Sequence, residues 1–295
     1  MKTGRRTRVR VLVTGGSGFV GGHVARAARE RGHIVAIGDL GPGEPDAVLD
    51  VLEVTAVVSA VAGCDVVIHC AAVVGPEPAR ARPLDAVTVN AIGLAHVLEA
   101  ARLHGKRVVH LSTATLYGMR PALEPLHESD TPTPVSHYDA TKFAAEVICQ
   151  SYRKDFDLNA VSVRTGFVYG PGHSTGEYFV ESAMRGESVS QESGAAQPCD
   201  FTYVKDLVRG LVLAAEAESL PEPVYNVTGG VLRTRGDFVE IVRKLIPDAN
   251  ITIGPGMNAA MHLRGPCVLD LAKRDFGYGA EYSLERGVGD WVGLG

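Results

Sequence analysis

The sequence predicts an α/β fold, a doubly wound parallel sheet with a smaller C-terminal lobe. Short β-branched runs recur along the first half of the chain, and Ala-rich segments long enough for a helix separate most of them. This alternation is typical of a parallel sheet. The runs are almost continuously apolar, as expected of strands that helices cover on both faces. Because 45% of the 295 residues are hydrophobic, the chain can bury a large core.

The elements can be assigned in chain order. Five segments are expected to form strands of the main sheet: Val9–Val13, Ile34–Ile37, Val66–Ile68, Val108–Leu111 and Ala160–Val163. Three segments between them are expected to form helices: Val24–Arg31, Ala86–His104 and Asp139–Tyr152. Gly32 and Gly105 follow the first two helices, where a glycine commonly ends a helix.

The chain is expected to divide after residue 168. Beyond Gly170, glycines and prolines break the chain into short pieces that are typical of loops over a site. Regular structure then returns as helices at Lys205–Ala217 and Asp237–Leu245 and a strand at Tyr225–Val227. We therefore expect a first domain at residues 1–168 and a substrate-binding lobe at residues 169–295, some of whose elements return to the main sheet.

Composition and charge disfavour several classes of protein. The 29 Lys and Arg residues against 34 Asp and Glu residues give a net charge of −5, which disfavours a nucleic-acid partner. No signal peptide is expected, and no uninterrupted apolar stretch approaches the roughly 20 residues of a membrane span. The five cysteines show no Cys-x-x-Cys spacing and the ten histidines no His-x-x-x-His spacing, so no metal site is expected. These features fit a cytoplasmic protein without a membrane partner.

A glycine-rich segment connects the first strand with the first helix. Glycines at positions 15, 18 and 21 leave room for a pyrophosphate and for tight helix packing, while the helix N-terminus faces the phosphates. The strand–turn–helix context makes this segment a dinucleotide-binding fingerprint of the Rossmann type. The expected cofactor contacts within it are Gly15, Ser17, Gly18, Phe19, Val20 and Gly21.

Asp39 at the end of the second strand indicates which dinucleotide binds. It follows Gly21 at close to the spacing of about 20 residues expected for the acid that accepts a hydrogen bond from a ribose 2′-hydroxyl. Its charge would repel the 2′-phosphate of NADP, and no Arg occupies positions 38 to 43. NAD is therefore the expected cofactor, and a merely solvated strand-end Asp39 is the alternative.

Tyr138 and Lys142 are candidates for catalysis. They lie four residues apart and share one face if their segment is helical. The strand before them ends in a hydroxyl-rich segment, Ser112–Gly118, at the carboxyl edge where a parallel sheet presents residues to ligands. This placement, rather than the spacing alone, distinguishes the pair from a chance occurrence.

On these motifs the sequence resembles the extended short-chain dehydrogenase/reductase family, in the branch called NAD-dependent epimerase/dehydratase. The resemblance spans residues 9 to about 230 and extends more loosely over 270–291. The matching segments occur in the family's order: Thr14–Gly21, Asp65–Ala72, Asn90, Thr113–Gly118, Tyr138–Lys142, Tyr169–Gly172 and Asp200–Val204.

The resemblance implies three catalytic residues. Tyr138 would move the proton of a substrate hydroxyl as hydride passes to or from the nicotinamide, and Thr113 would donate to the substrate oxygen. Lys142 would bind the nicotinamide ribose. Lowering the pKa of a phenol from about 10 to about 7 requires roughly 4 kcal/mol, which Lys142 and the oxidised nicotinamide would supply. Ser112 is the alternative to Thr113 if the register differs by one residue.

The same resemblance implies further cofactor contacts and a partner. Asp50 and Val51 resemble the adenine contact of the family, and the remaining expected contacts are Cys70, Ala71, Ala72 and Asn90. The predicted helices Ala86–His104 and Asp139–Tyr152 occupy the positions of the helices that form a four-helix bundle in dimers of this family. A homodimer is therefore expected.

We expect an NAD-dependent oxidoreductase that transfers hydride at a secondary alcohol or ketone carbon of a small, non-nucleotide substrate. Nucleotide-sugar enzymes of the family commonly hold the substrate diphosphate with an Asn and an Arg, and these positions are Phe167 and Cys199 here. Loss of the Arg contact alone removes about 1.5 to 3 kcal/mol of anion binding, although Arg185 or Arg233 could replace it. The favoured substrates are free sugars, sugar acids, hydroxysteroids or polyketide-like molecules.

Two alternatives remain open on the sequence. The first is a nucleotide-sugar 4-epimerase that retains NAD, because epimerases and dehydrogenases share this machinery. A dehydratase is disfavoured, since Ala114 and Thr115 stand where family 4,6-dehydratases carry an Asp-Glu pair. The second alternative is a catalytically silent NAD(P)-sensing protein, which the intact set of Thr113, Tyr138 and Lys142 disfavours.

Overall fold

The computed structural model describes residues 8–41, 46–172, 179–258 and 263–294. The chain forms two compact units, each built from several stretches of sequence. The first unit comprises Met1–Ser112, Ser136–Val163 and Leu211–Pro223, and the second comprises Thr113–Val135, Arg164–Gly210 and Val224–Gly295. This division differs from the single boundary expected after residue 168, because the chain passes between the units several times.

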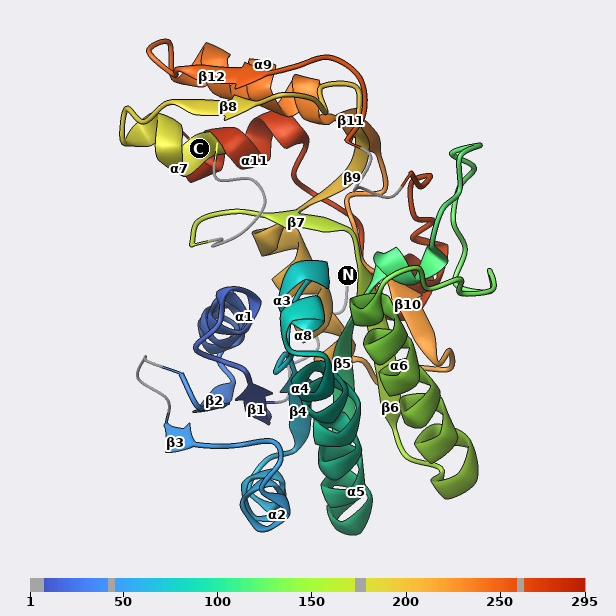
Figure 1. The fold of residues 1–295 in the computed structure, drawn as a ribbon. Helices are drawn as coiled ribbons and strands as arrows, with labels where there is room; N and C mark the ends of the chain where they lie inside the picture. The colour runs from blue at the N-terminus through green and yellow to red at the C-terminus, as the bar shows by residue number, and fades with distance from the viewer. Residues whose placement is uncertain (1–7, 42–45, 173–178, 259–262, 295) are drawn as a thin grey trace. The chain divides into compact units, whose positions relative to one another are not determined.

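A parallel sheet forms the centre of the first unit (Figure 1). Its strands, in spatial order, are β6 (Ala160–Thr165), β5 (Arg107–Thr113), β4 (Val66–His69), β1 (Arg10–Thr14), β2 (Ile34–Asp39) and β3 (Ala47–Val48). Thr14 pairs with Gly38 of β2 and with His69 of β4, so these strands end at one edge. The chain order reverses between β1 and β4, where a doubly wound sheet opens a crevice for a ligand. The sheet confirms the predicted fold class.

Helices flank this sheet. On one face, α2 (Val54–Ala62), α5 (Leu94–His104) and α6 (His137–Phe156) lie side by side (Figure 1). They share one apolar core with the strand residues Leu12, Val67 and Val108. The buried residues of α1 (Phe19–Glu30) do not belong to that core. Instead, Arg31 at the end of α1 forms an ion pair with Glu216, the last residue of α8 (Val204–Glu216).

The helix expected at Ala86–His104 is longer and irregular. After the short helix α3 (Pro76–Ala81), α4 (Pro83–Val87) passes into a π-helical turn, η1 (Thr88–Gly93), and then into α5. Gly105 adopts a left-handed conformation with φ of 61°, and it ends α5 as predicted. A π-helical turn holds an extra residue and often occurs at functional sites.

This helical run also bears on the question of membranes. Residues Pro83–His104 form 22 consecutive helical residues with a mean hydropathy of 1.3, which is long and apolar enough to cross a membrane by length and composition alone. The run is not an uninterrupted apolar stretch, because it contains Asp85, Glu99 and Arg102. Half of the apolar window is buried inside the protein, and a core helix of a soluble protein passes the same test.

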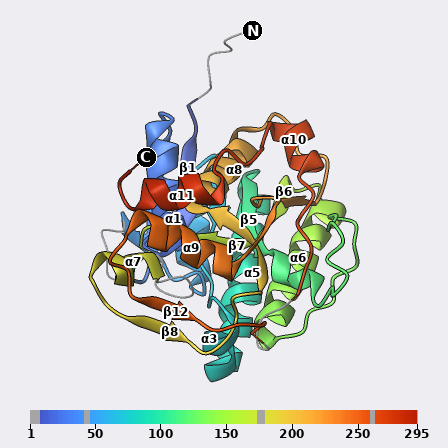
Figure 2. The same ribbon diagram turned by 90° about the horizontal axis from the view of Figure 1, so that it is seen from above.

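The second unit contains two small sheets. β11 (Leu232–Thr234), β9 (Pro198–Tyr203) and β7 (Phe167–Tyr169) form one sheet, and β12 (Ile251–Ile253) pairs with β8 (Val189–Gln191). Figure 2 shows α9 (Arg235–Leu245) and α11 (Leu284–Trp291) side by side, near α7 (Phe179–Met184). The aromatic rings of Tyr169, Phe201, Tyr203 and Phe238 pack together in this unit.

The remaining elements of the second unit are η2 (Ala114–Tyr117), β10 (Val224–Asn226) and α10 (Asp270–Phe276). Within this unit, the amide of Val227, directly after β10, donates to the carbonyl oxygen of Arg164. The expectation that elements of the C-terminal lobe return to the main sheet stays a prediction.

Candidate active site

The glycine loop between β1 and α1 is shaped by backbone contacts. A Cβ atom at Gly15, whose φ is +67°, would lie 2.6 Å from the amide nitrogen of Ala71. A Cβ atom at Gly21 would lie 2.1 Å from the carbonyl oxygen of Gly15. Glycine is therefore required at these two positions, because the backbone at Ala71 and at Gly15 lies too close for a side chain. At Gly18, the N-cap of α1, a Cβ would meet only the carbonyl oxygen of Gly15, at 3.3 Å.

The start of α1 suits an anionic ligand. In the described part of the chain no side chain caps α1, and its first turn, which begins with Phe19, Val20 and Gly21, contains no acidic residue. A helix N-terminus of this kind favours phosphate through its amides and its dipole. The hydroxyl oxygen of Ser17 is buried and has no hydrogen-bond partner among the described residues. A phosphate would satisfy that oxygen, so the loop fits a dinucleotide.

Asp39 is held against the glycine loop. One carboxylate oxygen accepts a hydrogen bond from the amide of Ser17 at 2.8 Å, and the other accepts from Leu40 at 2.7 Å and Gly41 at 2.9 Å. A carboxylate offers about four acceptor positions, so about one remains for a ribose hydroxyl. The structure thus places Asp39 where the sequence predicts it, with a single acceptor position left for the cofactor.

The segment after β4 lines the same loop. The amide of Cys70 donates to the carbonyl oxygen of Thr14 at 3.0 Å, and Ala71 is the residue that Gly15 approaches. Ala72 follows directly. Burial raises the pKa of the Cys70 thiol to about 12, so this thiol is neutral at physiological pH. Cys70 and Ala71 therefore lie together with the glycine loop, as their predicted role requires.

Asp50 and Val51 lie after β3. One carboxylate oxygen of Asp50 accepts a hydrogen bond from the amide of Leu52 at 2.9 Å. Val51 is buried, and its carbonyl oxygen lies 3.0 Å from Nδ1 of His96 on α5. A Cβ atom at Gly93 in the π-helical turn would lie 2.7 Å from Val51. Their contact with adenine stays a prediction.

Asn90 ties the π-helical turn to its surroundings. Its Oδ1 accepts from the amide of Val73 at 2.7 Å, and its Nδ2 donates to the carbonyl oxygen of Val73 at 3.0 Å and to Thr141 Oγ1 at 2.9 Å. Both amide protons are therefore used within the protein. Any contact of Asn90 with the cofactor is limited to the second acceptor position of Oδ1.

Tyr138 sits in the first turn of α6. A capping box begins this helix: Ser136 Oγ accepts from the amide of Asp139 at 3.1 Å, and Asp139 accepts from the amide of Ser136 at 3.0 Å. Tyr138 packs against the cluster of Val73, Ala79 and Ala86. Burial raises the pKa of Tyr138 above its usual value, and the charge of Asp139 adds to this. The phenol is therefore protonated in the free protein.

Lys142 lies one turn further along α6 and is buried. Its Nζ donates to the carbonyl oxygen of Leu111 at 2.7 Å and lies 2.9 Å from Nε2 of His110. Burial lowers the pKa of Lys142 to about 8, although the charge of Glu146 opposes this shift. The sequence prediction included Lys142 but missed His110, whose only signal is a polar residue within an apolar strand.

The two candidate hydroxyls differ in their partners. Ser112 Oγ donates to Glu146 Oε1 at 2.6 Å, and both residues are buried in the first unit. Thr113, which belongs to the second unit, caps η2: its Oγ1 accepts from the amide of Thr115 at 3.2 Å and lies 3.0 Å from Thr115 Oγ1. Because the Ser112 proton is taken by Glu146, Thr113 remains the better candidate.

The two positions expected to contact a substrate diphosphate are apolar or buried in the second unit. Phe167 packs edge to face on Phe201, with ring centroids 5.5 Å apart, and Cys199 is buried. The replacement anchors considered from the sequence are both engaged. Arg185 pairs with Glu187 at 2.7 Å, and Arg233 pairs with Glu285 at 2.8 Å and Asp237 at 3.3 Å.

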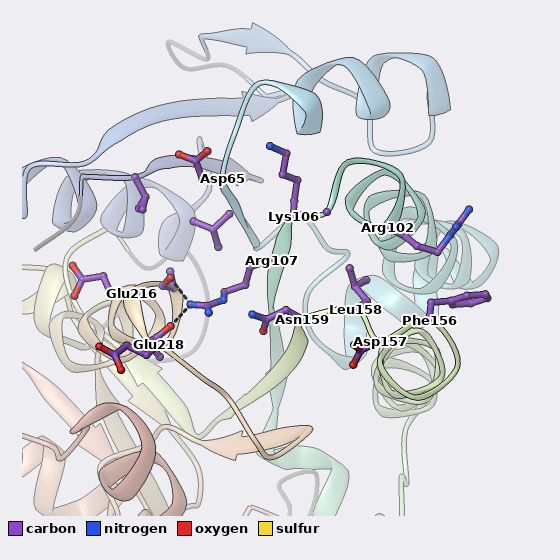
Figure 3. A pocket seen from close by; sticks show the side chains of 15 residues that line it. Asp65, Arg102, Lys106, Arg107, Phe156, Asp157, Leu158, Asn159, Glu216 and Glu218 are labelled. Carbon is purple, nitrogen blue, oxygen red and sulfur yellow. Dashed lines mark hydrogen bonds between the residues drawn. The ribbon is translucent and has the colours of Figure 1, made fainter.

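A cavity of about 740 Å³ lies at the opposite, amino edge of the sheet in the first unit (Figure 3). It is lined by residues at the starts of three strands, namely Asp65, Arg107 and Asn159. The Arg107 guanidinium donates to carbonyl oxygens of Ala215 and Ala217 at the end of α8, which the dashed lines in Figure 3 mark. This cavity is therefore separate from the glycine loop, and Arg107 has a structural role there.

Comparisons with known proteins show the family to which the chain belongs. Residues 11–228 match the model of the NAD dependent epimerase/dehydratase family. UDP-glucuronic acid decarboxylase 2 of Arabidopsis thaliana is 26% identical over 96% of this chain and 67% of its own length. UDP-glucose 4-epimerase of Mycolicibacterium smegmatis is 30% identical over 70% of this chain and 73% of its own.

Among solved structures, MoeE5 in complex with UDP-glucuronic acid and NAD superposes with a TM-score of 0.85 at 26% identity, covering 96% of this chain and 98% of its own. The family match covers well over half of the chain. Together with the glycine loop and the Tyr138–Lys142 pair on α6, it identifies the chain as an NAD-dependent enzyme that belongs to the NAD-dependent epimerase/dehydratase family.

Proposed function

We propose that this enzyme acts on a nucleoside-diphosphate sugar, as a nucleotide-sugar 4-epimerase that retains NAD. The observation that carries the proposal is similarity along nearly the whole chain to enzymes whose names and complexes contain UDP-sugars. That similarity includes the second unit, which would hold the substrate. It favours this alternative over the non-nucleotide substrate expected from Phe167 and Cys199.

The candidate residues would divide the steps of cofactor binding and proton transfer among them. The glycine loop and Asp39 would hold NAD, which supplies a hydride acceptor for the oxidation of a secondary alcohol. Tyr138 would exchange the proton of the sugar hydroxyl through its phenol oxygen, and Thr113 would donate to the same substrate oxygen. Since burial keeps Tyr138 protonated in the free protein, its activation depends on positive charge near the phenol when ligands are bound.

A second candidate function rests on the second unit. Phe167 and Cys199 offer no charge to a diphosphate, and Arg185 and Arg233 already pair with carboxylates. A non-nucleotide alcohol, such as a free sugar or a hydroxysteroid, would need no such anchor. This candidate uses the same NAD site and the same catalytic residues, so only substrate binding separates the two.

We further propose a cytoplasmic homodimer formed through α5 and α6. Leu103 of α5 is 55% exposed, and Val147 and Phe156 of α6 are 49% and 54% exposed, although both helices otherwise pack into the core. In the dimer that we propose, a second copy would cover exposed apolar side chains of these two helices. Cys64, Cys70, Cys149 and Cys267 are free thiols, which supports a reducing compartment.

The first prediction concerns cofactor choice. Asp39→Ala is expected to weaken NAD binding about tenfold and to relax discrimination against NADP, because one ribose acceptor and one negative charge are lost together. Titration calorimetry with both cofactors measures this. Asp39→Asn is the matched control, since it keeps one oxygen for the amides of Leu40 and Gly41. Tighter binding of NADP than of NAD by the wild-type protein would contradict the role of Asp39.

The second prediction concerns the proton. Tyr138→Phe is expected to lower turnover by at least about a thousandfold, as expected for loss of a general acid–base group, while NAD affinity stays within about twofold. Steady-state kinetics and calorimetry provide the two measurements. A Tyr138→Phe variant that keeps more than about a tenth of the wild-type rate would show that another group carries the proton.

The third prediction concerns substrate. With NAD present, UDP-glucose or UDP-glucuronic acid is expected to bind with micromolar affinity, and UDP alone is expected to bind measurably. The same preparation should release about one NAD per chain on denaturation, as a cofactor-retaining epimerase would. If neither uridine nor thymidine diphosphates bind while NAD does, the non-nucleotide candidate takes first place.

The fourth prediction concerns assembly. Replacing both Leu103 and Val147 by Asp is expected to convert a dimer into a monomer in sedimentation velocity, because two charges would be buried in the interface. Val231→Asp, at another exposed apolar position, is the control that should leave the mass unchanged. A wild-type protein that sediments as a monomer would exclude the dimer.

A further inference from the structure

A buried polar chain lies beneath Lys142, within the first unit. His110 is at the centre of β5, between Val109 and Leu111, and is fully buried. A buried imidazole is costly unless both ring nitrogens have partners. Here Nε2 lies 2.9 Å from Lys142 Nζ, and Nδ1 lies 3.1 Å from Ser162 Oγ on β6.

We infer that His110 is a positioning residue for Lys142. The neutral imidazole of His110 accepts a hydrogen bond from the Lys142 ammonium and holds Nζ in place. The inference rests on the role proposed for Lys142 in cofactor binding. An ammonium can only donate, so Nε2 of His110 must be the acceptor. The ring proton then lies on Nδ1, where it can be donated to Ser162 Oγ.

The arrangement leaves Lys142 with one donor for a ligand. An ammonium has three N–H groups, of which one goes to the carbonyl oxygen of Leu111 and one to His110. With two bonds fixed, the direction of the third is determined by the protein. Pre-orientation of this kind lowers the entropic cost of binding a ribose hydroxyl.

The acceptor also keeps Lys142 charged. Burial favours the neutral amine and lowers the pKa of Lys142 to about 8. A hydrogen bond to the charged form opposes that effect. Without the acceptor at His110, the buried ammonium would keep only the bond to Leu111, and its pKa would fall further. Lys142 would then lose its charge at a lower pH.

His110 itself stays neutral. Burial lowers its pKa well below the usual range, and the charge of Lys142 lowers it further. His69 lies directly opposite His110 in the β4–β5 pairing, with ring centroids 5.9 Å apart, and burial holds its pKa at about 3. A protonated His110 would place two positive charges 2.9 Å apart.

Other titratable groups around this chain are neutral or opposite in charge. Burial raises the pKa of the Cys70 thiol, after β4, and of the Cys149 thiol, on α6, to about 12. Glu146 on α6 accepts from Ser112, and its charge raises the pKa of Lys142. Near pH 8, Lys142 is therefore the group of this network whose charge we expect to change.

The test compares His110→Phe, which keeps the ring size but has no acceptor, with His110→Gln, which restores an acceptor. The dissociation constant of NAD is measured from pH 6 to 9.5 by calorimetry, or by exchange of labelled NAD where the cofactor co-purifies. Wild-type affinity is expected to fall as pH rises through about 8, because the ammonium contact is lost. His110→Phe should bind NAD about tenfold more weakly at pH 7 and lose affinity at a lower pH.

His110→Gln should recover most of the NAD affinity, and that affinity should again fall at the same pH as in the wild-type protein. His33→Phe is the matched control, because it removes another buried histidine of the same unit that pairs with Glu216. It should change the stability of the protein without moving the pH at which NAD affinity falls. The inference would be overturned if a folded His110→Phe protein bound NAD as tightly as the wild-type protein and lost affinity at the same pH.

A second measurement needs no variant. Nitrogen NMR of histidine-labelled wild-type protein should show His110 as a neutral ring protonated on Nδ1 between pH 6 and 9. A ring protonated on Nε2, or an imidazolium, would also overturn the inference. Both readouts follow NAD and His110 rather than the sugar, so failure of UDP-sugar binding would contradict the proposed substrate and leave this result intact.

Discussion

The site depends on a close backbone contact between the glycine loop and two neighbouring segments. Side chains at positions 15 and 21 would collide with the amide of Ala71 and the carbonyl oxygen of Gly15. Only glycine therefore allows β1, α1 and the segment after β4 to approach this closely. That approach leaves the uncapped start of α1 beside Ser17, whose amide in turn holds Asp39. The predicted cofactor contacts at this loop thus depend on one packing constraint.

Burial opposes the roles proposed for Tyr138 and Lys142, and the hydrogen-bond partners of Lys142 offset part of its effect. Burial disfavours the charged forms of both residues, although the proposed chemistry needs a phenolate and an ammonium. The bonds of Lys142 to Leu111 and His110 offset this effect for the ammonium. Among the residues that the structure describes, no comparable hydrogen bonds support a Tyr138 phenolate, so its proposed activation depends on bound ligands. Since the protein itself supports the Lys142 ammonium and bound ligands would support the Tyr138 phenolate, proton transfer would occur only when ligands are bound.

Much of the first unit could be predicted from the sequence. The five main strands, the glycine loop and the spacing of Tyr138 and Lys142 all follow from local patterns with a direct physical meaning. The partners of Asp39, Asn90 and Lys142 could not be predicted, because they depend on backbone groups from distant segments. The division into two units could not be predicted from local sequence patterns either. Thr113–Val135 belongs to the same unit as segments that begin about thirty residues or more after it.

The comparisons support the expected non-nucleotide substrate less well than its alternative, for a different reason. Phe167 and Cys199 do depart from the family pattern. However, two positions show only that the usual Asn and Arg contacts are missing there, and they do not describe the rest of the substrate site. Similarity along nearly the whole chain takes in the other positions as well, and the relatives concerned are named for UDP-sugars. The ion pairs of Arg185 and Arg233 show that charge counted along a sequence does not identify charge available to a ligand.

The π-helical turn at Thr88–Gly93 restricts which changes in chain length the protein can tolerate. Each residue of a helix turns the next by about 100°, so removing one residue here would rotate α5 by that amount about its axis. Leu94, Val97 and Leu98, now in the core, would turn out of it, while Asn90 would stay bonded to Val73. We therefore expect insertions and deletions in related sequences to avoid this segment and to gather in surface loops instead.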